Sequence, residues 1–587
     1  MNLELAAIIG VILVVAATTM APRIGVASPL LLIALGFGLS MLPWVDSFVV
    51  NPEWILAGVL PPLLYSAAAG TPVMEFRRDF RLISAFSVVL VVVTAVAIGL
   101  VTVWVVPGMP LGLGIALGAI VSPTDAVATS IVGKAGVSAR LVTVLEGESM
   151  LNDASALVLL RSAVAAVGVT VSLWQVAGSF VWAVVAAGAI GWVVGKLNLL
   201  VRYWVRNVPA GVALSLVVPF IAYLPAEHLG ASGLVAAVAA GLVTGYGAPE
   251  RIGAEERLAE AAVWHTVELL LESAVFLLVG LELPALVASL TDDGRYLLHP
   301  LALAALVGGL ALLIRTGFVA FAVWSLARRN RVVRPAHERL RQLHHQLADG
   351  QVPNPRPSVR KPRSALRRLR ASTAATPEAR LSRWQQLVGR RIADLDYLAS
   401  EQFGWRDGFV LVWAGMRGAV TIAAAQTLPE GTAHRPLIVL TATAVAVGTL
   451  VVQGLTLEPL ARRLGAISED SGPDPQLWQG LQGDLDEAAA QAVHPDERSA
   501  GAFTEARARL VESATGSDSI DWPALQSIST PAARARFREV RLAAITAQRL
   551  KLIELRALGT YPSAMLDDAL AQLDAQQISI ELRQQYD

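Results

Sequence analysis

The 587-residue chain has no cysteine and few charged residues, since Asp, Glu, Lys and Arg together make up 16% of it. Without cysteine there is no disulfide framework, no thiolate metal site and no cysteine nucleophile. Soluble domains carry about 25% charged residues, so the low content argues against a soluble protein. The 47 basic and 47 acidic residues cancel, which argues against nucleic acid as a partner. No Walker-type loop is present, so we expect neither ATP nor another cofactor.

Long hydrophobic runs fill most of the chain instead. Hydrophobic residues make up 54% of the sequence, and the mean hydropathy is +0.55. A bilayer core of about 30 Å needs roughly 20 apolar residues per helix, and this criterion predicts thirteen transmembrane helices. They cover residues 4–22, 28–44, 54–70, 83–106, 111–132, 141–166, 173–195, 209–226, 230–247, 261–285, 299–327, 407–428 and 436–460.

Basic residues in the connections between these runs predict the orientation. They gather in alternate connections, at Arg23, Arg77, Arg78, Arg81, Lys134, Arg140, Lys196, Arg202, Arg206, Arg251 and Arg257. Positively charged connections face the cytoplasm. We therefore expect a multi-pass protein of the cell membrane, with its N-terminus outside and its C-terminus in the cytoplasm.

The predicted transmembrane domain covers residues 1–462 and includes one long connection outside the membrane, and a second segment outside the membrane follows it. The connection 328–406 is basic and rich in proline, and we expect it either on anionic lipid headgroups or free in the cytoplasm. Residues 463–587 begin with a polar linker and then show helical spacing over 532–558, with Gly559 as a stop signal. They predict a small helical cytoplasmic domain, with regulation as a hypothesis.

Two acidic residues fall near the middle of predicted membrane helices. Asp125 lies in the fifth helix and Asp153 in the sixth. An ionisable group at that depth is costly and needs a partner, a proton or a bound ion. The structural alternative is that each carboxylate only pairs with an arginine inside the membrane.

Other oxygen-bearing groups accompany these acids. Ser149 precedes Asp153 by four residues and shares its helix face, and Asn152 adds an amide. The proline before Thr124 has no N–H for the helix, so we expect a break that frees the carbonyl group of Thr124. Carboxylate, hydroxyl and carbonyl oxygens without imidazole or thiolate suit a hard cation. We therefore predict a site for a monovalent cation at Asp153, Asp125, Ser149 and Thr124.

Such a site couples cation and proton movement. Burial raises the pKa of a carboxylic acid and a bound cation lowers it, so a carboxylate that holds either one expels the other. Alternate exposure of Asp153 to the two sides makes an exchanger. One monovalent cation against one proton moves no net charge, provided that Asp125 keeps one protonation state.

Two other classes of protein use buried acids. An intramembrane aspartyl protease also has two, but its Gly-x-Gly-Asp surroundings are absent from both acids here. A cation channel passes ions without proton coupling, and its carboxylates form rings in an oligomeric pore.

Five segments together resemble the monovalent cation:proton antiporter-1 family, in its bacterial sodium/proton exchanger form. They are residues 61–66, 122–125, 147–153, 276–283 and 415–420, in the family's order, and the resemblance covers 5–462. It implies an all-α fold of thirteen spans, with two inverted six-helix repeats that form a core and a dimerisation domain, and two broken helices that cross near the ion site. It also implies a homodimer that exchanges Na⁺, or alternatively Li⁺ or K⁺, for protons by alternating access in pH homeostasis.

The resemblance assigns roles to individual residues. Asp153 is expected to be the ion- and proton-binding carboxylate, with Asn152 and Ser149 beside it. Thr124 is expected to offer its carbonyl group, and Asp125 to act directly or through water. The Asn-Asp pair is associated in this family with electroneutral exchange.

Three further charged residues are expected to be structural. Glu148 should form a buried ion pair with Arg315. Arg417 is the second candidate for that pair, and otherwise it should balance the negative helix ends at the crossing. Removal of one member of such a pair costs about 3–5 kcal/mol because it leaves an uncompensated charge.

The sequence departs from the family's pattern at three places. Many members carry an acid where Ser66 stands, so a third carboxylate is missing and both Na⁺ and K⁺ stay open. Glu272 replaces an expected asparagine and Glu268 lies one turn earlier; we expect them to pair with Arg315, or alternatively to be extra cation ligands. Glu146 is expected to line an entry funnel or to be an interfacial charge in water.

Overall fold

The chain folds into two units, each described here by itself from a computed structural model. Unit 1 comprises Met1–Trp324 and Phe403–Ser471, and unit 2 comprises Ser325–Gln402 and Gly472–Asp587. The structure describes residues 3–24, 27–42, 53–134, 136–167, 173–205, 207–292, 298–348, 397, 403–429, 431–465, 475–492 and 531–586. These residues form helices and no strand. The predicted boundary at residue 462 stays a prediction.

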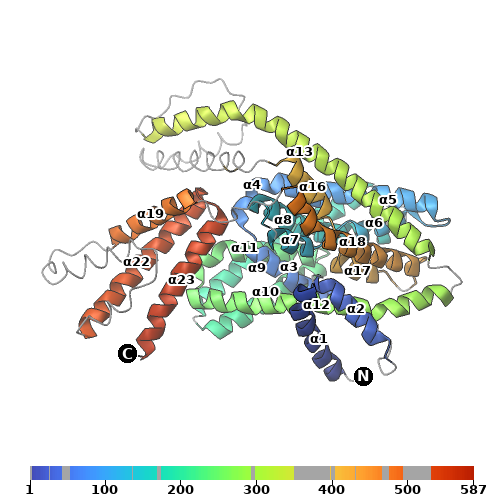
Figure 1. Cartoon of the computed structure of the whole chain (residues 1–587), viewed down its shortest axis with the longest axis horizontal. Helices are drawn as coiled ribbons and strands as arrows, with labels where there is room; N and C mark the ends of the chain where they lie inside the picture. Colours follow the sequence, from blue (N-terminus) through green and yellow to red (C-terminus); the bar gives the residue numbers. More distant parts are fainter. Residues whose placement is uncertain are drawn as a thin grey trace. The chain divides into compact units, whose positions relative to one another are not determined.

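Unit 1 consists of a succession of helices (Figure 1). They are α1 (Leu3–Ile24), α2 (Ser28–Ser40), the π-helical η1 (Trp54–Val59) leading into α3 (Leu60–Gly70), α4 (Val73–Ser84) leading through the π-helical η2 (Ala85–Leu90) into α5 (Val91–Val105), α6 (Leu111–Val121), α7 (Ala126–Lys134), α8 (Ala139–Ala165), α9 (Leu173–Trp204), α10 (Val208–His228), α11 (Gly233–Arg251), α12 (Ala254–Asp292), the start of α13 (Leu298–Ala348), α16 (Trp405–Trp413), α17 (Ala419–Gln426) and α18 (Arg435–Arg463).

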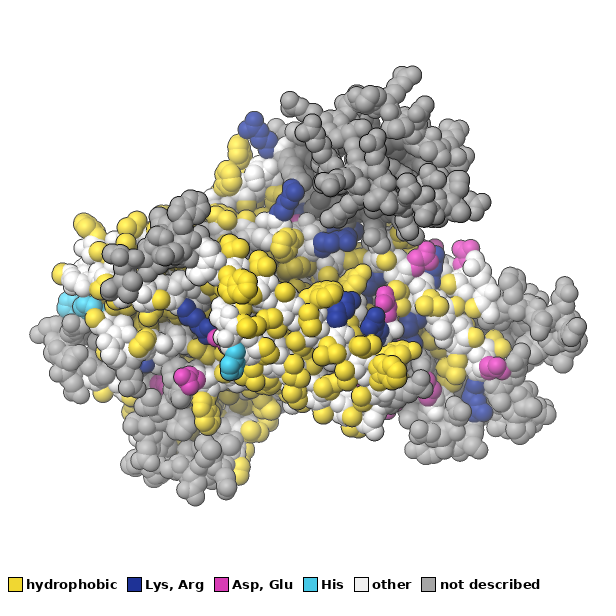
Figure 2. Space-filling model, turned by 180° about the vertical axis from the view of Figure 1, so that it is seen from behind, with side chains coloured by type: hydrophobic (Ala, Val, Ile, Leu, Met, Phe, Trp, Pro, Cys, Tyr) yellow, Lys and Arg dark blue, Asp and Glu magenta, His cyan; other side chains and the backbone are white. Residues whose placement is uncertain are grey.

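Every predicted membrane run coincides with one helix or with two or three consecutive helices. Five helices in the described part of the chain are long and apolar enough to cross a membrane by length and composition alone. Hydrophobic side chains cover much of the face seen in Figure 2, and large ones such as Trp192 and Phe321 are exposed. Soluble monomers rarely expose large apolar patches, so this surface fits lipid. The number of thirteen spans stays a prediction.

Several helices start earlier or end later than the apolar runs. Arg77, Arg78 and Arg81 were expected in a connection, yet they lie on α4, which begins at Val73. Arg140 lies in the first turn of α8, and Arg202 in the last turn of α9. Hydropathy locates only the apolar part of a helix, whereas arginine is a good helix former and lets the helix continue past it.

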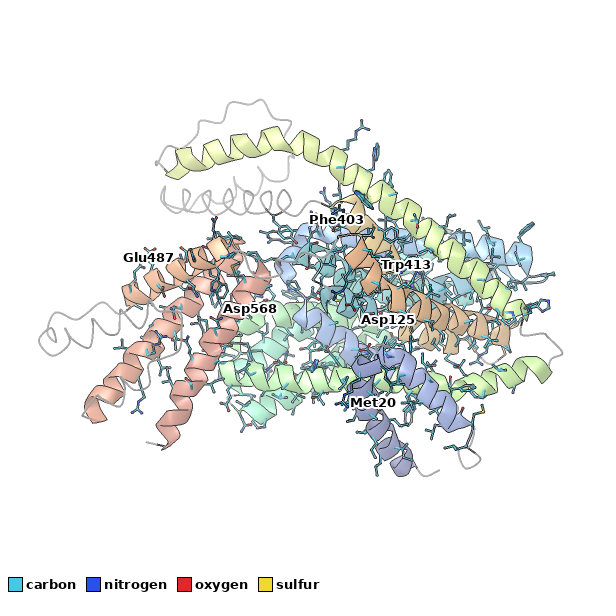
Figure 3. The ribbon with its side chains drawn as sticks, viewed as in Figure 1. Met20, Asp125, Phe403, Trp413, Glu487 and Asp568 are labelled. Atoms are coloured by element: carbon cyan, nitrogen blue, oxygen red, sulfur yellow. The ribbon has the colours of Figure 1, made fainter. Side chains whose placement is uncertain are left out.

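Two of the predicted runs are interrupted. Residues 122–125 separate α6 from α7, and residues 414–418 separate α16 from α17. The first break is confirmed where it was predicted, at Pro123. The two breaks meet, because the backbone N–H of Asp125 donates to the carbonyl oxygen of Met416 over 2.8 Å. Non-helical backbone at membrane depth is tolerated where protein surrounds it, and this crossing lies inside unit 1 (Figure 3).

Small residues allow close packing of α11 against α9 and α3. A Cβ atom at Gly191 of α9 would lie 2.3 Å from the carbonyl oxygen of Ala236, and one at Gly241 would lie 2.4 Å from that of Tyr65. Membrane helices commonly pack in this way, since small residues let their backbones approach. The five helices α3, α9, α10, α11 and α12 share a hydrophobic cluster of their own.

Unit 2 contains α19 (Pro475–Ala492), α22 (Pro531–Leu558) and α23 (Ser563–Tyr586). The helix predicted over 532–558 is thereby confirmed as α22. Gly559 follows it with φ +74°, a conformation that glycine adopts without a steric penalty. Leu485, Ile545 and Leu566, one from each helix, are buried. The regulatory role of this segment stays a hypothesis, and most of the basic connection 328–406 lies outside the described residues.

Candidate functional site

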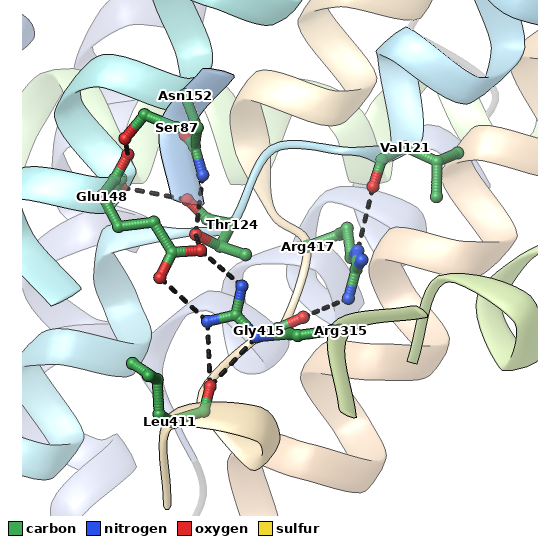
Figure 4. A network of polar contacts seen from close by, with 10 residues as sticks. Ser87, Val121, Thr124, Glu148, Asn152, Arg315, Leu411, Gly415 and Arg417 are labelled. Carbon is green, nitrogen blue, oxygen red and sulfur yellow. Dashed lines mark hydrogen bonds and ion pairs between the residues drawn. The ribbon is translucent and has the colours of Figure 1, made fainter. Parts of the chain in front are cut away.

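Thr124, in the break between α6 and α7, forms hydrogen bonds with α8. Its carbonyl oxygen accepts a hydrogen bond from Oγ of Ser149 over 2.9 Å, and its hydroxyl accepts one from Nδ2 of Asn152 over 2.8 Å. The same hydroxyl donates to Oε1 of Glu148 over 3.4 Å. Three neighbouring residues of α8 therefore hold the non-helical backbone of residues 122–125 in place (Figure 4).

Asp153 follows directly on α8 and is buried, with 5% of its surface exposed. Among the described residues no hydrogen-bond partner reaches its Oδ1 atom, nor Oδ1 of Asn152. Asp125 directly follows Thr124, which is bonded to Ser149 and Asn152 on the turn of α8 that carries Asp153, so the two acids belong to the same site. Buried polar atoms are normally hydrogen-bonded because the loss of water is unfavourable. These oxygens therefore suit a proton or a cation, and a carbonyl oxygen such as that of Thr124 keeps a second lone pair for a cation.

Asp125 lies at the crossing of the two broken helices. A Cβ atom at Gly418 would lie 1.4 Å from Oδ2 of Asp125, so only glycine leaves room for the carboxylate there. Gly418 directly precedes α17. The N-terminus of a helix carries a partial positive charge, and the carboxylate of Asp125 is placed to offset it.

Arg417 contacts the C-terminal ends of the two broken helices at the same crossing. Its Nε donates to the carbonyl oxygen of Val121, the last residue of α6, over 2.9 Å. Its Nη1 donates to the carbonyl oxygen of Gly415, just beyond the end of α16. The C-terminal end of a helix carries a partial negative charge. Arg417 therefore lies where it balances helix ends, and it is not the ion-pair partner of Glu148.

Glu148 and Arg315 form a buried ion pair, with side chains 1% and 2% exposed. Nη1 of Arg315 contacts Oε1 of Glu148, and Nη2 lies 3.0 Å from Oε2. Nε and Nη2 also donate to the carbonyl oxygen of Leu411, over 3.0 and 2.8 Å. A Cβ atom at Gly415 would lie 2.6 Å from Nε of Arg315. The guanidinium group is thus enclosed between α8, α16 and the second break.

Glu272 and Glu268 are not part of this pair, so their expected pairing with Arg315 was wrong. The hydrogen bonds of Arg315 in the described structure go to Glu148 and to Leu411, which leaves little of the guanidinium group for a further carboxylate. Both acids are half-buried on α12, as Ser66 is on α3 and Glu146 on α8. Their roles at the site stay predictions.

Sequence reasoning missed two contacts of α8 that the structure shows. Arg140, counted above as a residue of a connection, is buried and pairs with Asp79 of α4. Ser87 of η2 donates to the carbonyl oxygen of Glu148 over 3.2 Å. No signal in the sequence indicated the first contact, because hydropathy placed Arg140 in a connection and not in the first turn of a helix.

The chain is similar to known proteins along most of its length. The family described as "Sodium/hydrogen exchanger, transmembrane" matches residues 9–341 and 386–463. An uncharacterised Na⁺/H⁺ exchanger of Escherichia coli is 38% identical over an alignment 270 positions long, which covers 44% of this chain and 49% of that protein. An uncharacterised Na⁺/H⁺ exchanger of Mycobacterium tuberculosis is 28% identical over an alignment 590 positions long, which covers 97% of this chain and 94% of that protein.

A solved structure shares the fold. The sodium proton antiporter MjNhaP1 from Methanocaldococcus jannaschii superimposes with a TM-score of 0.51 at 15% sequence identity, over 78% of this chain and 97% of that one. At this identity the likeness concerns the fold alone. It supports the all-helical fold.

Proposed function

Because the chain belongs to the sodium/hydrogen exchanger family, we propose that it exchanges a monovalent cation for a proton and that Asp153 binds either of the two. The protein is a multi-pass membrane transporter and not an enzyme, and neither the aspartyl protease nor the channel is favoured. The observation that carries the proposal is the buried Oδ1 of Asp153, which has no hydrogen-bond partner among the described residues. It lies on the helix whose Ser149 binds the buried carbonyl oxygen of Thr124, the residue that precedes the second acid, Asp125.

The cation would be held by oxygens of two elements. Asp153 and Ser149 come from α8, and Thr124 and Asp125 come from the first break, with Asn152 as a neighbour that fixes Thr124. Broken helices offer backbone carbonyl groups to Na⁺ in many transporters. An all-oxygen set without imidazole or thiolate suits Na⁺, Li⁺ or K⁺, and the absence of an acid at Ser66 keeps K⁺ as the alternative to Na⁺.

Competition at one carboxylate gives the coupling. A proton on Asp153 removes the negative charge that a cation needs, and a bound cation makes protonation unfavourable. The other charges near the site are compensated by fixed partners: Glu148 by Arg315, and Arg417 by helix-end carbonyl groups. Asp125 faces the start of α17, and its protonation state is taken to stay the same throughout the cycle. One cation then replaces one proton, and exchange is electroneutral.

Further properties of the family complete the proposal. They are alternating access by a core moving against a dimerisation domain, two inverted repeats, a homodimer in the cell membrane, and a role in pH homeostasis. The basic connections favour an external N-terminus and a cytoplasmic C-terminus. The cytoplasmic tail is proposed to regulate exchange, and the basic connection 328–406 to contact anionic lipid.

Flux in everted membrane vesicles tests this function. A pulse of Na⁺, Li⁺ or K⁺ should dissipate an imposed pH gradient, and Asp153→Asn should abolish the response while the protein still elutes as a folded species. Asp568→Asn, the same chemical change at an exposed residue of unit 2, is the matched control and should leave exchange intact. Gradient collapse that survives Asp153→Asn would rule out the assigned role. Acceleration of Na⁺ exchange by a clamped membrane potential would contradict the one-for-one stoichiometry.

A further inference from the structure

Arg140 is buried at a position where a positive charge is unfavourable. It lies in the first turn of α8, whose N-terminus carries a partial positive charge. An arginine near the end of a membrane helix normally extends its long side chain to water. Here only 3% of the residue is exposed. A strong attraction elsewhere must therefore hold its guanidinium group inside the protein.

Asp79 of α4 provides that attraction. Nε of Arg140 donates to Oδ2 of Asp79 over 2.8 Å, and Nη2 donates to Oδ1 over 2.6 Å. Both side chains are 4% exposed, and the guanidinium carbon lies 4.8 Å from the ring centroid of Phe403. Two parallel hydrogen bonds and an aromatic face fix both the position and the plane of the group. Phe403 lies just before α16 (Figure 3), so the pair also contacts the start of the second broken helix.

A second polar contact joins the same two elements further along. Ser87 donates to the carbonyl oxygen of Glu148 over 3.2 Å. Ser87 lies eight residues after Asp79, and Glu148 lies eight residues after Arg140, so α4 with η2 runs parallel to α8. Eight residues correspond to about 12 Å of helix, and the two contacts together prevent α8 from sliding along its axis. Between the two contacts, Gly147 of α8 packs closely on Ile83 of α4, since a Cβ atom at Gly147 would lie 2.7 Å from the Ile83 Cδ1 atom.

The axial position of α8 determines the geometry of the ion site. Ser149 and Asn152 reach Thr124 only at one register, and Asp153 follows them on the same helix. We propose that Asp79 and Arg140 are a positioning pair, which holds α8 in the register that places Asp153 against the non-helical backbone of the first break. The pair touches no cation itself. The proposal rests on the cation site proposed at Asp153.

Transport kinetics in vesicles test this role. The main variant is Asp79→Leu/Arg140→Leu, because replacing both members of a buried ion pair by apolar residues leaves no stranded charge. Since a misplacement of about 1 Å can cost up to about 100-fold, we expect the apparent KM for Na⁺ to rise about tenfold. The maximal rate per folded transporter should stay within about twofold, because Asp153 itself is intact. Glu458→Leu/Arg462→Leu, which removes an exposed ion pair of α18, is the matched control and should leave KM unchanged.

Two single variants keep the test decisive if the double variant does not fold. Arg140→Lys keeps the positive charge but loses the bidentate contact with Asp79. Ser87→Ala removes only the hydrogen bond to the carbonyl oxygen of Glu148. Each variant should raise the apparent KM for Na⁺ about threefold, a smaller effect than the loss of both charges. An unchanged KM in the folded variants, with only the amount of folded protein reduced, would overturn the proposal and leave the pair a purely structural one. Failure of the proposed function is distinguishable, since it would appear as exchange that survives Asp153→Asn.

Discussion

Removal of the charge of Arg315 is expected to destabilise the protein severely. Arg315→Leu would leave the carboxylate of Glu148 almost fully enclosed, with 1% of its side chain exposed, and would strip the Leu411 carbonyl oxygen of its two donors. Breaking a buried ion pair by removing one partner costs about 3–5 kcal/mol, because the remaining charge is uncompensated. In detergent, this corresponds to a fall of about 5–10 °C in the apparent Tm.

The matched double variant separates charge from packing. Glu148→Leu/Arg315→Leu removes both charges and should recover most of the lost Tm, whereas Glu148→Leu alone leaves Arg315 without a counter-charge. A thermal series on the purified wild type, the two single variants and the double variant gives the coupling free energy. We expect coupling of about 2 kcal/mol or more, with the double variant more stable than either single one. Additive losses, or a Tm for Arg315→Leu within about 2 °C of wild type, would refute this account of the pair.

Two smaller changes test the role of glycine. Gly418→Ala would place a Cβ atom 1.4 Å from Oδ2 of Asp125, so the carboxylate must move. The apparent KM for Na⁺ in vesicles should therefore rise about tenfold. An unaltered KM would contradict the position of Asp125 at the site. Gly559→Ala would put a side chain on a backbone with φ +74°, a strained conformation that costs about 1–3 kcal/mol. Amide hydrogen exchange should therefore become faster in the last turn of α22, relative to α19. Equal exchange rates in the variant and the wild type would contradict this strain.

Local chemistry explains which parts of the fold could be predicted from the sequence. Proline lacks a backbone N–H whatever surrounds it, so the break at Pro123 was predictable. Apolar runs of about 20 residues indicate membrane helices by their length alone, and the helical spacing before Gly559 correctly predicted α22. The break at 414–418 was not located from the sequence, because no proline marks it; the resemblance implied only that a second helix is broken.

Contacts between distant helices were the part that could not be predicted. Asp79 and Arg140 are 61 residues apart, and no local pattern in either helix points to the other. Hydropathy placed Arg140 in a connection, although the helix starts before it. The same reasoning offered Glu272 to Arg315, because charge alone does not show that Glu148 and the Leu411 carbonyl oxygen already occupy the guanidinium group.

Proton release on cation binding tests the central claim most directly. Purified protein in weakly buffered solution would be titrated with Na⁺, and both the bound cation and the change in pH would be measured. Competition at Asp153 predicts that a proton leaves for each cation bound at a pH where the free carboxyl group is protonated, and that Asp153→Asn neither binds Na⁺ at this site nor releases a proton. Tight Na⁺ binding without proton release by the wild type would contradict the account.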